Sequence, residues 1–163
     1  MATKTANLTL TDDGLRFEAV VGSGHMIVMD GADRDTGARP AELVAVALAG
    51  CTAMDVISIL RKKRQAVTTY EVRASAEQMD GHPNAFTRID LVHVFTGEDV
   101  DPEAVRRSIE LSATKYCSVG STLASGALQI HHAYLIREAA GEERYAEVVV
   151  MGPHQAVTEA PAR

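Results

Sequence analysis

The chain has 163 residues, of which 46% are hydrophobic, and this is enough for a single domain with a buried core. Its 22 acidic residues against 16 basic ones give a formal net charge of −6, which disfavours nucleic-acid phosphates and anionic membrane surfaces as partners. The N-terminal residues show no basic stretch followed by an apolar one, so we expect a cytosolic protein. In that compartment the two cysteines predict buried thiols or redox chemistry, because cytosolic proteins rarely use structural disulfides.

Turn-forming residues divide the N-terminal segment into three short strands. We predict strands over residues 7–11, 15–21 and 25–29, because turn signals rich in aspartate and glycine separate them. Strands this close in sequence pair most simply as an antiparallel meander. The polar residues 30–37 then predict a loop.

The segment from Pro40 to Arg64 predicts one long helix that is apolar almost all the way round. Proline suits the first turn of a helix, and the basic residues 61–64 suit its last turn. Such a helix either spans a membrane or is covered by neighbours on every side. Asp55 near the middle and the many small residues favour the covered helix. Because one small domain cannot surround it, we expect a second subunit to cover part of it in a homodimer.

The rest of the chain predicts a second sheet with helices. Residues 67–78 and 86–95 alternate apolar and polar side chains, which indicates a β-hairpin. A helix follows from residue 101 to about residue 115, with Ser112 on its core-facing side, and then a short helix over 118–124 and a strand over 128–136. We therefore predict an α+β domain over residues 1–140. Residues 141–163 form a C-terminal extension, with an extra strand over 144–151 and a loose tail after it.

Cys51 and Cys117 are the residues best suited to chemistry. Cys51 lies in the middle of the long helix among small residues, and Cys117 lies where a short helix begins, which would lower the pKa of its thiol. Each cysteine also fits a purely structural interpretation, in which its side chain packs as a small buried hydrophobic group. Two cysteines on the inner parts of two helices could instead meet as attacking and resolving thiols. The sequence leaves open whether they touch.

Peroxide reduction by a thiol needs a nearby cation to favour the thiolate. Arg39 is the first candidate, with Arg16 and Arg34 as alternatives, and Glu42 could orient such an arginine through a bidentate pair. Asp55 follows Cys51 by one helical turn and would raise a thiol pKa unless it pairs with a basic group. The six histidines are scattered without zinc-ligand spacing, and no phosphate-binding or dinucleotide motif is present, so we expect neither a metal nor a bound organic cofactor.

Two segments resemble the OsmC/Ohr family. Residues 39–55 read RPAELVAVALAGCTAMD, and residues 115–119 read KYCSV. The resemblance implies an α+β fold with antiparallel sheets packed on long central helices, an intertwined homodimer, and active sites at the subunit interface. It also implies that Cys51 is the peroxidatic thiol and Cys117 the resolving thiol.

The chain departs from the family pattern at three places and looks like the OsmC-like branch rather than the organic hydroperoxide resistance branch. Ala41 stands where the family has its catalytic glutamate, and the acid comes one residue later as Glu42. Ser118 stands where the family has proline after the second cysteine. The family's catalytic arginine has no fixed counterpart here, and Arg39 is the first choice on proximity, with Arg16 second.

Three hypotheses follow for the function. The first is a two-cysteine peroxidase that reduces organic hydroperoxides or hydrogen peroxide in oxidative-stress defence and is regenerated by an external dithiol reductant. The second is a non-enzymatic dimer of the same fold that senses redox state or binds a small hydrophobic ligand. The third is a purely structural dimer with inert cysteines.

Overall fold

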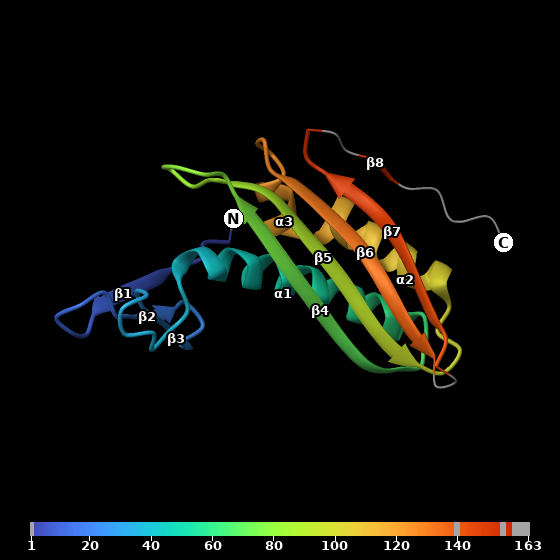
Figure 1. Cartoon of the computed structure of the whole chain (residues 1–163). Coiled ribbons are helices and arrows are strands. Elements are labelled where there is room, and N and C mark those ends of the chain that lie inside the picture. Colours follow the sequence, from blue (N-terminus) through green and yellow to red (C-terminus); the bar gives the residue numbers. More distant parts are fainter. Residues whose placement is uncertain (1, 139–140, 154–155, 158–163) are drawn as a thin grey trace. The chain divides into compact units, whose positions relative to one another are not determined.

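The computed structural model describes residues 2–138, 141–153 and 156–157 (Figure 1). The chain divides into two compact units, residues 1–44 and residues 45–163. Helix α1 (Pro40–Lys62) begins in the first unit and continues into the second. The predicted division into a domain over 1–140 and an extension over 141–163 stays a prediction.

The first unit contains the predicted antiparallel meander. Strands β1 (Ala6–Leu10), β2 (Phe17–Val21) and β3 (Met26–Met29) form a three-stranded sheet in that order. Gly24 has a φ of 86°, which fits glycine in the tight turn between β2 and β3. Several large apolar side chains of this unit are exposed in the single chain: Leu8, Leu10, Leu15, Val20, Met26 and Ile27.

Helix α1 confirms the predicted long helix and ends two residues earlier than expected. Arg64 has a φ of 57°, a left-handed conformation that does not continue a helix. Four side chains at intervals of four residues are buried along one side of α1: Leu48, Thr52, Val56 and Leu60. In contrast, Val46 and Met54 are 62% and 74% exposed. The single chain therefore covers one side of the helix and not all sides.

Helix α1 is also long and apolar enough to cross a membrane when only its length and composition are considered. Core helices of water-soluble proteins can have the same length and composition, so these two properties do not distinguish the alternatives. In the most apolar stretch of this helix, 22% of the residues are buried inside the chain.

The second unit is built on a five-stranded sheet, in the order β4 (Val67–Gln78), β5 (Phe86–Gly97), β6 (Gln129–Glu138), β7 (Glu143–Met151) and β8 (Ala156–Val157). Strands β4 and β5 form the predicted antiparallel hairpin. Strands β5 and β6 run parallel, however, so the expectation of purely antiparallel sheets was wrong for this sheet. The reason is that the chain between them crosses over through helices, which a parallel pair requires.

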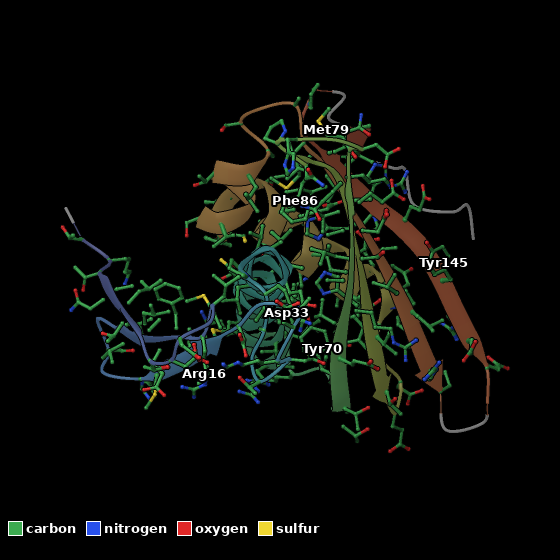
Figure 2. All side chains as sticks on the ribbon, turned by 60° about the vertical axis from the view of Figure 1, so that its left-hand side comes forward. Arg16, Asp33, Tyr70, Met79, Phe86 and Tyr145 are labelled. Carbon is green, nitrogen blue, oxygen red and sulfur yellow. The ribbon has the colours of Figure 1, made fainter. Side chains whose placement is uncertain are left out.

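The crossover consists of α2 (Pro102–Leu111), the π-helical turn η1 (Ser112–Tyr116) and α3 (Ser118–Leu123). Asp101 caps α2 by accepting a hydrogen bond from the backbone N–H of Glu103 at 3.0 Å. The predicted helix to residue 115 is therefore an α-helix that widens into a π-turn at Ser112. These helices and the second-unit part of α1 lie on one face of the sheet, which Figure 2 shows nearly edge-on.

The core of the second unit lies between this sheet face and the helices. Fully buried apolar side chains come from α2 and from the central strands: Val105, Ile109, Ile89, Leu91, Phe95, Ile130 and Ile136. Tyr145 of β7 is 60% exposed and lies on the opposite side of the sheet (Figure 2).

A strand occupies the start of the predicted C-terminal extension. Strand β7 covers residues 143–151, where we expected a strand over 144–151, and β8 pairs with it. Of the predicted loose tail over 152–163, residues 154–155 and 158–163 lie outside the described residues.

Candidate thiol site

The two cysteines lie close together in the second unit. Cys51 is half-buried on α1, and Cys117 is 3% exposed at the junction between η1 and α3. Both are free thiols, and their side chains lie close enough to interact with each other. The contact that the sequence left open is therefore present between segments 66 positions apart, since 117 − 51 = 66.

The π-turn and the short helix after it fix the position of Cys117. Its backbone N–H donates to the carbonyl oxygen of Ser112 at 2.8 Å, which closes the wide turn of η1. Its Sγ accepts a hydrogen bond from the backbone N–H of Gly120 at 3.2 Å, so the sulfur caps α3. A π-turn inside a helical segment is rare and often marks a functional position.

The Cys117 thiol is held in its protonated form. Burial raises its pKa to about 12, and the interaction with Cys51 acts in the same direction. The N–H of Gly120 lowers this pKa, but its effect is smaller than that of burial. The expectation of a lowered thiol pKa at Cys117 was wrong, because burial outweighs the single amide at the start of α3.

A cluster of three polar side chains connects the two elements that carry the cysteines. Ser112 Oγ of η1 donates to Asp55 Oδ2 of α1 at 3.0 Å, and Thr52 Oγ1 of α1 lies 3.0 Å from the same hydroxyl. Pairing with a basic group was one alternative for Asp55, and within this chain the structure gives it the Ser112 hydroxyl. The sequence marked Ser112 as a core position, but it did not reveal this role, because its partners are about 60 residues away in the chain.

Arg39 and Glu42 lie in the first unit, at the start of α1. The backbone N–H of Arg39 donates to Glu42 Oε2 at 2.8 Å, while its guanidinium pairs with Asp35. The predicted bidentate pair between the two side chains is replaced by this arrangement, because Glu42 caps the helix. Asp35 raises the pKa of Arg39 further above its ordinary value. The roles of Arg39 and Glu42 toward the thiols stay predictions.

The two alternative arginines are also paired within the first unit. Arg16 Nη1 lies 2.8 Å from Glu18 Oε1, and Arg34 Nη1 lies 2.9 Å from Asp12 Oδ2. Arg34 also pairs with Asp13. These exposed or half-exposed pairs are typical of surface charges.

A buried chain of hydrogen bonds crosses the sheet of the second unit. Tyr70 Oη lies 2.7 Å from His93 Nδ1, and His93 Nε2 lies 3.4 Å from His132 Nδ1. Burial lowers the pKa of His93 well below its usual range and that of His132 to about 4, so both rings are neutral at neutral pH. The histidines had been interpreted as scattered, because their alignment depends on strand register.

No group of three or more histidine, cysteine, aspartate or glutamate side chains suited to a metal ion is found among the described residues.

The sequence matches the family described as OsmC-like protein over residues 31–132, which is more than half of the chain. Protein YhfA of Escherichia coli strain K12 is 44% identical over 122 residues, covering 75% of this chain and 90% of the relative. The chain therefore belongs to the OsmC-like protein family.

Solved structures agree in fold. An OsmC-like protein from Mycoplasma pneumoniae superimposes with a TM-score of 0.71 at 14% identity, covering 83% of this chain and 97% of that one. An organic hydroperoxide resistance protein from Elizabethkingia anophelis gives a TM-score of 0.59 at 15% identity, covering 83% of this chain and 96% of that one. At these identities the likeness establishes the α+β fold alone.

Proposed function

We propose that this protein is a thiol-dependent reductase of hydroperoxides, with Cys51 as the peroxidatic thiol and Cys117 as the resolving thiol. The proximity of the two cysteine side chains is the observation that carries the proposal. Membership of a family whose fold is shared with an organic hydroperoxide resistance protein supports it. The substrate class is an organic hydroperoxide or hydrogen peroxide.

The exposure of the two sulfurs supports this division of roles. Cys51 is the more accessible of the pair, while Cys117 is buried and protonated at neutral pH. The Cys51 thiolate attacks the distal peroxide oxygen and the O–O bond breaks, and the leaving alkoxide or hydroxide takes up the proton that the Cys51 thiol gave up when it ionised, so that alcohol or water departs. Cys51 becomes a sulfenic acid, which Cys117 converts into a disulfide. An external dithiol in the cytosol then reduces the disulfide.

The proposal includes Arg39 as the cation beside the thiolate, with Glu42 holding its backbone N–H and with Arg16 as the second choice. Arg39 immediately precedes α1, the helix that carries Cys51. Its guanidinium must leave Asp35, or share it, to act on a thiolate.

We also propose that the functional form is a homodimer. Val46 and Met54 expose large apolar side chains on α1, and a buried location for them would be favourable. The exposed apolar side chains of the first-unit sheet suit burial in the same way. A second copy of the chain can bury large apolar side chains of this kind on either unit.

A second candidate function is binding of a small hydrophobic ligand. The first unit contains an apolar cavity of about 360 Å³, lined mainly by Leu8, Leu15, Phe17, Met29 and Pro40. Its nearly complete lack of polar lining atoms favours an apolar ligand. This function does not need reactive cysteines, so thiol kinetics distinguish the two candidates.

Anaerobic stopped-flow mixing of the reduced protein with cumene hydroperoxide and with hydrogen peroxide tests the proposal. We expect fast consumption of at least one peroxide, abolished in Cys51→Ser and arrested at the sulfenic acid in Cys117→Ser. Arg39→Met should lower kcat/KM by at least roughly tenfold, the effect of losing a charge that stabilises a thiolate. Arg34→Met, which removes a surface guanidinium, serves as its control. Consumption no faster than with a free thiol would contradict the peroxidase function.

A further inference from the structure

Positive charge gathers at the C-terminal end of α1. Arg61, Lys62, Lys63 and Arg64 are consecutive and exposed. Every other arginine in the described part of the chain forms an ion pair with a carboxylate there, whereas Arg61 and Arg64 form none with a described residue. Because the whole chain carries a net charge of −6, these residues are a local exception that attracts anions.

A hollow of about 330 Å³ lies beside Arg61, between the end of α1 and the start of β4. It is lined by Ile57, Arg61, Gln65, Val67, Thr68, Thr69 and Tyr70. None of these described residues carries a carboxylate. The neighbouring hollow beside Arg64, in contrast, is lined by Glu98 and Asp99, which offset the charge of that arginine. Arg61 therefore lines a hollow that contains no counter-charge of its own.

The start of β4 is irregular and leaves a hydrogen-bonding group at the hollow. Val67 pairs with Gly97 and Thr69 pairs with Thr96, so Thr68 is an extra residue that forms a β-bulge. The hydroxyl of Thr68 donates to the carbonyl oxygen of Thr96 at 2.9 Å. The hydroxyl of Thr69 has no hydrogen-bond partner among the described residues, so it can donate to a ligand.

The preference of helix ends for cations explains only part of this arrangement. Basic side chains stabilise the C-terminal end of a helix, where its dipole is negative. That preference accounts for the basic residues 61–64, but it requires neither a hollow nor apolar side chains beside one arginine. Ile57, Val67 and Tyr70 provide such side chains, which an organic ligand can contact and an inorganic ion cannot use.

We propose that this hollow binds a small organic anion, whose carboxylate or phosphate group pairs with Arg61 and accepts a hydrogen bond from Thr69. An arginine presents its donors in a planar fork that matches both groups. The volume is sufficient, because a cavity of about 150 Å³ already holds a molecule of the size of benzene. Neither cysteine lines the hollow, so the inference stands apart from the proposed function.

Titration of the full chain, followed by calorimetry and by backbone amide NMR shifts, tests the inference. The probes are benzoate, phenyl phosphate and inorganic phosphate, and benzamide is the uncharged counterpart of benzoate. We expect at least one organic anion to bind and benzamide to bind at least roughly tenfold more weakly, because it lacks the charge that pairs with arginine. The amides of residues 65–70 should shift. The organic anion that binds more tightly identifies the charged group that the site prefers.

Replacement of Arg61 separates a defined site from general attraction. Arg61→Gln should weaken binding of the preferred anion at least roughly tenfold, because the charged hydrogen bonds are lost. The position is exposed, so the variant should fold. Lys62→Gln is the matched control, since it removes the same charge one residue along but does not line the hollow. It should weaken binding less than about threefold, as a screened surface charge does.

Four results would overturn the inference. They are the absence of organic anion binding at millimolar concentration, binding of benzamide as tight as that of the better organic anion, amide shifts confined to segments outside residues 57–70, and equal weakening by Lys62→Gln and Arg61→Gln. The last result would mean that the basic residues attract anions as a diffuse patch without a defined site.

Discussion

Burial determines the protonation of the polar side chains inside the second unit. It raises the pKa of the Cys117 thiol and of the Tyr70 hydroxyl, and it lowers the pKa of His93 and His132. All four shifts favour the neutral form, which is the form that a low-dielectric interior tolerates. These four groups are therefore neutral donors and acceptors in the interior of the second unit.

The buried histidines predict a loss of stability in mild acid. Their folded-state pKa values lie below the ordinary 6.5, so the unfolded chain takes up protons first as the pH falls. Stability is fully present above pH 6.5 and is lost toward pH 4, by on the order of 2 kcal/mol for His132 alone between pH 7 and pH 5. Urea unfolding at the two pH values measures this loss.

Replacement of His132 tests the assignment. His132→Asn should reduce the difference in the free energy of unfolding between pH 7 and pH 5, because one buried titrating ring is removed. His82→Asn is the matched control, since His82 is exposed in the turn between β4 and β5. An unchanged pH dependence in His132→Asn would mean that its ring does not govern acid stability.

At the scale of secondary structure, α1 has two different surfaces. One side packs inside its own chain through Leu48, Val56 and Leu60, while Val46 and Met54 remain uncovered. An amphipathic pattern is absent from its sequence, because both surfaces are apolar. The contrast between them becomes visible when each surface is altered separately.

The covered side of α1 should respond strongly to truncation. Leu60 is fully buried, and Leu60→Ala should lower the free energy of unfolding by about 2 to 5 kcal/mol. Ser58→Ala, two residues earlier at an exposed position, should change it by less than about 0.5 kcal/mol. Denaturant unfolding of both variants measures the contrast, and equal effects would show that the buried stripe is assigned incorrectly.

The sequence predicts the local elements well, because turn residues and hydrophobic periodicity are local signals. It predicts β4 with the bounds Val67–Gln78, and it places Pro40 at the start of α1. The parallel pairing of β5 with β6 was missed, because alternation within a strand does not reveal the direction of its neighbour.

The sequence predicted which cysteines form the candidate site, but it did not predict the burial and the polar side chains around them. The resemblance identified Cys51 and Cys117, whose side chains do meet. The raised pKa of Cys117 was not foreseen, because burial at a helix junction depends on tertiary packing. The link from Asp55 to Ser112 joins residues 57 positions apart, a distance over which periodicity carries no information.

At the scale of the whole molecule, the exposed apolar side chains on both units support the proposed homodimer. Most monomeric proteins do not expose apolar surface of this kind without a binding role. A homodimer built on α1 accounts for the exposed Val46 and Met54, and it would give each thiol pair a neighbouring subunit.

A charge on the uncovered side of α1 should therefore weaken the dimer. Met54→Lys should shift the assembly toward the single-chain mass and weaken association at least roughly tenfold, because a lysine would be buried unpaired at the interface. Met79→Lys is the matched control, since Met79 is 46% exposed next to the end of β4. Sedimentation equilibrium measures both, and a wild-type protein that is monomeric at micromolar concentration would contradict the dimer.

The most direct measurement of the thiol mechanism is peptide mapping after one equivalent of hydroperoxide. Mass spectrometry without reduction should find the peptides that contain Cys51 and Cys117 joined by a disulfide, with the loss of two hydrogen atoms. The bond should form within one chain, because the two side chains already contact each other there. Recovery of Cys51 as sulfinic acid with Cys117 still a free thiol, or of both as free thiols, would contradict a redox pair.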